Sequence, residues 1–377
     1  MSDVDEAQLQ QLRSEVRTFL AQQIETGAFQ PIVDGWLSGF DAEFSRTLAA
    51  QGWVGMTIPV EYGGHGRSFM ERFIVTEELL AAGAPVAAHW ISDRQIAPGL
   101  LKYGTEEQKQ RYLPRIAAGE LYFAIGMSEP DSGSDLASVQ TRAEKVDGGW
   151  RLYGTKVWTS NAHKAHGFFA LVRTSPATEG DRHTGLSQLI VDLRGDGVTV
   201  NPILSLDGSA HFNEVVFDGA FVPDSDLLGT LGEGWKQVTS ELKFERSGPE
   251  RIMSSFPALA RLTEALAADG VDPEPELGRY IARLTGLRRL SADVAKRLQK
   301  DEPVELTAAM VKILGTGLEG DLADYTATWA HELGDDTELA RLSRSALMRR
   351  AGFTLRGGTN EILRGIVARG LEKQYAA

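Results

Sequence analysis

One loop-like segment determines how the whole chain is interpreted: Ile125-Gly126-Met127-Ser128-Glu129-Pro130-Asp131-Ser132-Gly133-Ser134-Asp135. Pro130 fixes φ and lacks an N–H, while Gly126 and Gly133 allow backbone geometries that are closed to other residues. A loop with many free N–H groups and short hydroxyls can wrap closely around a polar, flat or phosphate-bearing ligand. The same residue types also form ordinary surface turns, so this segment alone leaves both interpretations open.

A second segment follows downstream, Gly154-Thr155-Lys156-Val157-Trp158-Thr159-Ser160-Asn161. It is a strand-like run in which one Trp stands among polar side chains. Together the two segments resemble the acyl-CoA dehydrogenase superfamily, whose flavin lies against two such segments. The remainder of the chain tests that resemblance.

Composition limits the possible classes of function. The chain has 377 residues, enough for two or three packed modules, and is 42% hydrophobic and 24% charged, as soluble globular proteins are. A formal net charge of −13 argues against nucleic acid as a partner, because phosphate binding needs clustered Lys and Arg. The absence of cysteine excludes disulfides, thiol nucleophiles and thiolate metal sites.

The sequence also shows no pattern typical of a membrane span, a signal peptide or a metal-binding site. No apolar run approaches the length of a membrane span, and the N-terminus is acidic rather than basic and then apolar. We therefore expect a cytoplasmic protein with no membrane span. His163, His183 and His211 are too scattered along the sequence for a metal site, so no metal is expected.

The order of secondary structure has three parts. Amphipathic patterns predict helices at 5–28, 40–51, 70–82, 96–103 and 105–118, the last with Thr105 as its N-cap. From about Tyr122 the runs become short, β-branched or aromatic, with Asp147-Gly148-Gly149 as a hairpin signal, and they suggest a small antiparallel barrel or sandwich. From Trp235 onward the pattern is helical again.

Further motifs extend the resemblance over nearly the whole chain. They are Tyr103-Gly104-Thr105-Glu106-Glu107-Gln108-Lys109, Leu113-Pro114, Gly119-Glu120, Phe212-Asn213-Glu214-Val215, Val222-Pro223, Leu228-Gly229 and Gly357-Gly358-Thr359-Asn360-Glu361-Ile362. The resemblance implies an α+β multidomain fold. Its parts would be an α-helical N-terminal domain at 1–121, a middle β-barrel domain at 122–230 and a C-terminal four-helix bundle at 231–377.

The resemblance also implies a set of contacts to FAD. Ile125, Met127, Ser128 and Ser134 would line the flavin, and the position of Ser134 would serve the bound thioester as well. Trp158 and Ser160 would supply an aromatic wall and a hydroxyl near the flavin N5. A barrel-core position is the alternative for Trp158, because Trp in a strand is usually buried.

Two glycines precede the last predicted helix, in Gly357-Gly358-Thr359. Such a sequence permits close backbone approach to a ligand, and the free N–H groups of a helix start favour anions or carbonyl oxygens. A plain helix-entry loop is the alternative. The resemblance implies that Thr359 and Glu361 contact the flavin and that Gly357 and Gly358 lie beside the substrate.

The chain departs from many family members at the catalytic base. Those members keep a glutamate immediately before the Gly-Thr pair, where this chain has Gly357. Others carry the base on the first helix of the C-terminal domain, and Gly234 to Arg246 matches that helix, with Glu245 at the alternative base position. Glu241 lies one turn earlier on the same face. Most helix glutamates are solvated charges, which is the alternative for both.

The expected reaction is the flavin-dependent α,β-dehydrogenation of an acyl-CoA thioester to the trans-2-enoyl-CoA. By resemblance, Glu245 removes the α proton, the backbone N–H of Gly357 polarises the thioester carbonyl, and the β-hydride passes to the flavin. An electron-transfer flavoprotein would then reoxidise the flavin. Lys243 and Arg246 are further substrate-binding candidates, Arg246 for the CoA nucleotide. An acyl-carrier protein could replace CoA as the carrier.

Several alternatives stay open. An acyl-CoA oxidase or a reduced-flavin monooxygenase could share this fold. A non-catalytic subunit of a mixed α2β2 tetramer is a further alternative, because the family's adenine-side motif is missing after residue 251 and Arg279 is its nearest remnant. A homo- or hetero-oligomer, either dimer or tetramer, is expected.

Overall fold

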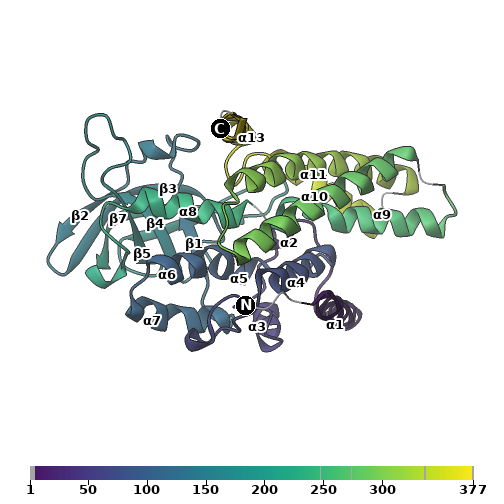
Figure 1. Ribbon diagram of the computed structural model, residues 1–377, viewed down its shortest axis with the longest axis horizontal. Coiled ribbons are helices and arrows are strands. Elements are labelled where there is room, and N and C mark those ends of the chain that lie inside the picture. The colour runs from purple at the N-terminus through teal and green to yellow at the C-terminus, as the bar shows by residue number, and fades with distance from the viewer. Residues whose placement is uncertain (1–4, 247, 273, 335–336, 376–377) are drawn as a thin grey trace. The chain divides into compact units, whose positions relative to one another are not determined.

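The structure is a computed structural model that describes residues 5–246, 248–272, 274–334 and 337–375, without the side chains of 241–245 and 374–375. The chain divides into two compact units (Figure 1). The helical unit comprises Met1–Gly39, Arg67–Val86 and Glu245–Ala377, and the sheet unit comprises Phe40–Gly66 and Ala87–Phe244. The three domain boundaries expected from the sequence stay a prediction.

Long helices build the helical unit. They are α1 (Glu6–Glu25), α2 (Gly35–Ser38), α4 (Phe69–Ala81), the short 3-10 turn η5 (Pro249–Arg251), α9 (Phe256–Ala268), α10 (Pro275–Gln299), α11 (Glu305–Leu333), α12 (Glu338–Phe353) and α13 (Asn360–Tyr375). Helix α11 contacts α9, α10, α12 and α13 and is apolar around most of its circumference, as a central helix must be. The predicted helical C-terminal region is therefore confirmed.

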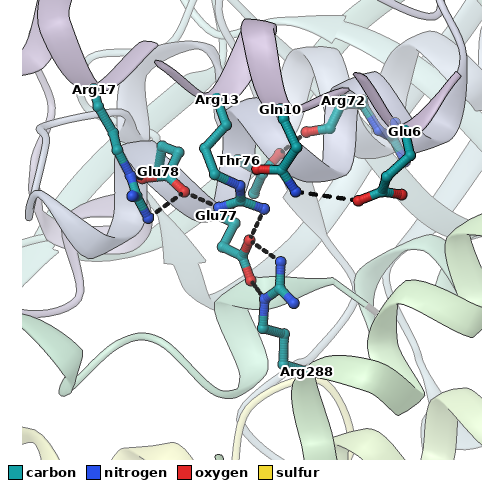
Figure 2. Close-up of polar contacts among 9 residues, drawn as sticks. All are labelled: Glu6, Gln10, Arg13, Arg17, Arg72, Thr76, Glu77, Glu78 and Arg288. Carbon is teal, nitrogen blue, oxygen red and sulfur yellow. Dashed lines mark hydrogen bonds and ion pairs between the residues drawn. The ribbon is translucent and has the colours of Figure 1, made fainter. Parts of the chain in front are cut away.

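A cluster of ion pairs joins α1 and α4 to α10 within this unit (Figure 2). Arg13 contacts both Glu77 and Glu78, with 2.6 Å between Arg13 Nη2 and Glu77 Oε2. Arg288 reaches Glu77 from α10, and Arg17 reaches Glu78 at 2.6 Å from its Nε. Both carboxylates are buried. Because each buried carboxylate contacts two guanidiniums, its desolvation is offset by ion pairing.

The sheet unit combines a helical half with a β half. Its helices are α3 (Ala42–Ala50), the 3-10 turn η1 (Val60–Tyr62), α5 (Ala87–Ile91), the π-helical turn η2 (Ser92–Ile96), α6 (Ala97–Tyr103), α7 (Glu106–Ala117) and α8 (Gly234–Glu245). Its strands and remaining turns are β1 (Phe123–Gly126), η3 (Leu136–Ser138), β2 (Arg142–Val146), β3 (Gly149–Ser160), β4 (Gly167–Arg173), β5 (Leu186–Asp192), β6 (Val198–Ile203), β7 (Phe212–Pro223), η4 (Asp224–Asp226) and β8 (Leu227–Leu228).

Two local predictions are confirmed here. Thr105 caps α7 through a capping box with Gln108, in which each side chain accepts from the other residue's backbone N–H. Strands β2 and β3 form the predicted hairpin, with Val146 opposite Gly149 and Gly148 at a φ of +72°. A positive φ at this turn is the reason that glycine is required there.

The predicted barrel is wrong in one respect, because the sheet is open. In the described residues the strand order is β6-β7-β3-β2-β4-β5-β8, with β1 added in parallel to β4, and the edge strands β6 and β8 do not pair with each other. Closure requires every strand to share one tilt and register shift, and β8 has only two residues with which to pair. Evenly spaced short strands do not by themselves distinguish a closed sheet from an open one.

Among the described residues, no helix combines the length and the apolar character that a bilayer crossing would need.

Candidate functional site

In the sheet unit, the two segments singled out in the sequence lie side by side. The backbone N–H of Val157 donates to the carbonyl oxygen of Ser128 at 2.9 Å. Met127 and Ser128 continue from the end of β1 and are half-buried, as is Ile125. The structure thus brings Ile125, Met127 and Ser128 next to the part of β3 that carries Trp158.

A buried ion pair holds this junction together. The Lys156 ammonium donates to Glu129 Oε1 at 2.8 Å and to the Met127 carbonyl at 3.1 Å, and the Lys156 side chain is fully buried. Burial lowers the pKa of Lys156 to about 8, an effect that the attraction of Glu129 partly offsets. The Glu129 carboxylate also accepts hydrogen bonds from the backbone N–H groups of Gln140 and Thr141, at 2.6 and 2.9 Å.

This pair fixes the start of the serine-rich loop, and no sequence pattern predicted it. Burial alone would raise the pKa of Glu129, but the Lys156 ammonium and the Gln140 N–H together lower it. Glu129 is therefore a charged anchor rather than a proton carrier. In the sequence, Glu129 is only an acidic residue before Pro130, and such residues are also common in ordinary turns.

Trp158 has an unusual backbone conformation for a strand residue. Its φ is +61°, and the β3–β7 register shifts between Lys156 and Thr159, as at a β-bulge. Bulky residues rarely adopt positive φ, and such strain is typically found where a side chain must be aimed for function. The side chain is 59% exposed and meets Phe212 edge to face, with ring centroids 5.9 Å apart. The barrel-core alternative for Trp158 is therefore wrong.

The two remaining serines of this half occupy different environments. Ser160 is half-buried at the end of β3, opposite Phe212 on β7. Ser134 is exposed in a loop whose end is held by Asp135, which pairs with Arg182 at 2.6 Å. Ser160 therefore lies close to Trp158 in sequence and register, whereas Ser134 lies on an open segment.

In the helical unit, the candidate residues gather on the loop of residues 354–360 between α12 and α13. Gly357 and Gly358 have φ values of +71° and +85°, which favour glycine at both positions. Arg246 Nε donates to the Gly357 carbonyl at 3.0 Å. The Thr359 hydroxyl accepts from the N–H of Ile362 at 3.3 Å, as an N-cap side chain does.

Glu361 and Arg279 are both on the surface of this unit. Hydrogen bonds from its own backbone N–H and from the Thr359 hydroxyl lower the pKa of the exposed Glu361. Arg279 pairs with Glu276 one turn away on α10, at 2.5 Å. The side chains of Glu245 and Lys243 lie outside the described residues, although α8 extends to Glu245. The described residues contain no group of acidic and histidine side chains that could hold a metal ion.

A buried network supports the loop from the other side, and the sequence did not reveal it. Arg356 donates to both carboxylate oxygens of Asp34, at 2.6 and 2.8 Å, and stacks 4.6 Å above the centre of the Trp36 ring. Glu319, on α11, accepts from the Ser254 N–H at 2.7 Å. Burial raises the pKa of Glu319 to about 7, although Arg356 partly opposes that shift.

Glu319 predicts a pH dependence of stability. Because its pKa rises from 4.5 to about 7 on folding, its stabilising contribution is complete below about pH 4.5 and is lost as pH rises through 7. The loss amounts to about 3 kcal/mol of unfolding free energy between pH 4.5 and 8. Glu319→Gln, which mimics the neutral form, should remove that slope in urea unfolding at pH 5 and 8. The exposed Glu332→Gln on the same helix should retain it, and equal slopes in all three proteins would contradict the assignment.

Comparison with known proteins identifies the family. Three family models match: acyl-CoA dehydrogenase N-terminal domain at residues 6–120, middle domain at 124–220 and C-terminal domain at 232–372. Acyl-CoA dehydrogenase IpdE1 of Mycobacterium tuberculosis is 33% identical over 386 residues, covering 98% of this chain and 97% of that protein.

Two solved structures are similar over almost their whole length. One is described as Tcur3481-Tcur3483 steroid ACAD, with 30% identity, a TM-score of 0.84, and coverage of 98% of this chain and 99% of that one. The other is the ChsE4-ChsE5 complex from Mycobacterium tuberculosis, with 29% identity, a TM-score of 0.81, and 97% coverage of each chain. Sequence and fold agree, and the chain belongs to the acyl-CoA dehydrogenase family of oxidoreductases.

Proposed function

We propose that this acyl-CoA dehydrogenase binds FAD and converts an acyl-CoA thioester to its trans-2-enoyl-CoA, passing electrons to an electron-transfer flavoprotein. The observation that carries the proposal is Trp158, an exposed indole on a strained bulge beside Met127 and Ser128. A flat aromatic ring presented to solvent next to free hydroxyls fits an isoalloxazine ring better than it fits a packing role. When bound, FAD supplies the hydride-accepting chemistry.

The candidate residues would bind either FAD or the substrate. Ile125, Met127, Ser128, Ser134 and Ser160 would hold the flavin together with Trp158, and Thr359, Glu361 and Arg279 are the further residues proposed to contact FAD. Gly357, Gly358, Ser134, Lys243 and Arg246 would contact the thioester or its CoA. Arg246 donates to the Gly357 carbonyl through Nε, so its role would include holding the loop.

Glu245 would accept the α proton of the thioester. The backbone N–H of Gly357, in the loop, would donate a hydrogen bond to the thioester carbonyl and so polarise it. A donor of this kind typically stabilises the developing negative charge by about 3 kcal/mol. Gly357 has no carboxylate of its own, so the base must come from another position.

A second, related chain would complete the FAD site. The adenine-side motif expected after residue 251 is missing, and its nearest remnant, Arg279, pairs with Glu276 on the surface. Similarity to a structure described as the ChsE4-ChsE5 complex supports assembly with a different but homologous chain. Similarity to the Tcur3481-Tcur3483 steroid ACAD supports a steroid-derived acyl group as the first substrate class to test.

The test begins with the colour of the purified protein. An enzyme that holds FAD alone should be yellow with about one flavin per chain, whereas a colourless chain that takes up FAD only with a homologous partner supports the mixed assembly. Anaerobic addition of saturated acyl-CoAs of short, long, branched and steroid-derived types should bleach the flavin absorbance. Absence of bleaching with every acyl-CoA, by an FAD-loaded protein, would overturn the proposal. Rapid peroxide formation in air would favour the oxidase alternative instead.

Trp158→Ala should weaken FAD binding about fivefold, because aromatic stacking contributes roughly 1 kcal/mol beyond buried area. The dissociation constant of FAD can be measured by quenching of flavin fluorescence. Phe221→Ala, at another exposed aromatic on β7, is the matched control and should leave the dissociation constant unchanged. Equal FAD affinity in all three proteins would contradict a stacking role for Trp158.

A further inference from the structure

Lys312 is a fully buried lysine whose ammonium donates to three acceptors within residues 354–360. From α11, its ammonium donates to the carbonyl of Thr354 at 2.8 Å, to the carbonyl of Gly358 at 2.7 Å and to Asn360 Oδ1 at 2.8 Å. An ammonium has three N–H donors, and three acceptors are filled here. They belong to the C-cap of α12, the middle of the loop and the first residue of α13. Lys312 therefore ties both ends of the loop and its centre to α11.

A hydrogen bond that holds a backbone carbonyl also fixes the direction of the N–H in the same peptide unit. The Gly357 carbonyl points to Arg246, and the Gly358 carbonyl points to Lys312. No cis peptide bond occurs in the described chain, and in a trans peptide the N–H points opposite to the C=O of the same unit. The N–H groups of Gly358 and Thr359 therefore point away from the two cations.

These N–H groups are free to bind a ligand. The N–H groups of Gly357, Gly358 and Thr359 make no hydrogen bond to another described residue. Because these residues are half-buried at a helix start, their N–H groups are satisfied by water or by a ligand, and they are therefore available to an external acceptor. Successive N–H groups at positive φ, ahead of a helix N-terminus, suit an oxygen that carries negative charge.

We propose that Lys312 is a positioning residue for the thioester carbonyl. By holding the carbonyls of Thr354 and Gly358, it would fix the loop on both sides of Gly357, so that the free N–H groups, that of Gly357 among them, face the oxygen on which charge develops. This proposal rests on the proposed function, since it needs a thioester at the loop. A purely structural role is the competing explanation, but burying an ammonium is unfavourable and an apolar side chain of similar length would fill the same space.

The test uses the FAD-loaded enzyme, with its partner chain if loading requires one. The probe is the CoA thioester of para-dimethylaminocinnamic acid, whose absorbance moves to longer wavelength when its carbonyl oxygen accepts hydrogen bonds. Lys312→Met removes the three donors and keeps the side-chain length. Asn360→Ala is a milder variant that removes one acceptor of Lys312, in case Lys312→Met does not fold. Thr326→Ala is the matched control, a buried substitution on the same helix away from the loop.

Lys312→Met should bind FAD and the probe but give a clearly smaller red shift, and kcat should fall roughly tenfold while KM changes less. Asn360→Ala should give an intermediate red shift, and Thr326→Ala should match the unmodified protein. A full red shift in both Lys312→Met and Asn360→Ala would overturn the proposal. If Lys312→Met folds poorly and Asn360→Ala does not, the red shift in Asn360→Ala alone tests the proposal: a reduced shift supports it and a full shift overturns it. An unmodified, FAD-loaded enzyme that binds no probe and is bleached by no acyl-CoA would remove the proposed function, and the Lys312 proposal with it.

Discussion

Glu245→Gln is expected to retain bound FAD and to reduce turnover of a saturated acyl-CoA by roughly 10²- to 10⁴-fold, the range that general base catalysis contributes. Glutamine keeps the size of the side chain and removes its ability to accept the α proton. Flavin bleaching under anaerobic conditions, measured by stopped flow, separates this chemical step from reoxidation. KM should change less than kcat, because the substitution leaves the CoA contacts in place.

Glu241→Gln is the matched control, since Glu241 lies one helical turn before Glu245 on α8. It should retain most of the activity. The backbone supports the choice of Glu245: α8 ends at this residue, and the 3-10 turn that begins at Pro249 follows. Pro249 cannot donate the N–H that would continue the helix past Glu245. If Glu241→Gln abolishes activity and Glu245→Gln does not, the base lies one turn earlier.

Elements whose signals are local could be predicted from the sequence. The cap of α7 needs only Thr105 and Gln108, three residues apart, and the β2–β3 turn needs only the glycine at 148. Helix α11 was predicted as part of a helical region because its apolar residues recur along a long segment. Closure of the sheet could not be predicted, because it depends on whether β6 meets β8, and no local pattern encodes that pairing.

Some residues of the candidate site could likewise be predicted from the sequence, and others could not. The two segments at 125–135 and 154–161 were identified by their resemblance to the family, and the Ser128–Val157 hydrogen bond confirms that the segments are adjacent. The cations that hold these loops were not identified. Lys156 and Glu129 are 27 positions apart, and Lys312 and Gly358 are 46 apart. A lysine in a strand or a helix is usually exposed, so its burial becomes visible only once the chain is folded.

The ion cluster between α1, α4 and α10 leads to the second large prediction (Figure 2). Glu77 has a side chain that is 6% exposed, and it accepts from Arg13 at 2.6 Å and from Arg288 Nη2 at 2.9 Å. Hydrogen bonding to Glu77 raises the pKa of Arg288, so the Arg288 guanidinium stays charged. Glu77→Gln would therefore leave Arg13 buried with a positive charge that only Glu78 still balances.

Removing one member of a buried ion pair typically costs 3–5 kcal/mol, so Glu77→Gln should lower the unfolding free energy of the helical unit by about 3 kcal/mol. Urea unfolding followed by circular dichroism measures the loss. Glu264→Gln breaks a pair of similar length with Arg261, at 2.9 Å, but on an exposed surface, and should cost less than about 1 kcal/mol. A double-mutant cycle of Glu77→Gln with Arg13→Gln should give a coupling energy of about 1–3 kcal/mol. A loss no larger than that of Glu264→Gln would mean that water screens the cluster, and that apolar packing rather than charge joins α1 to α4.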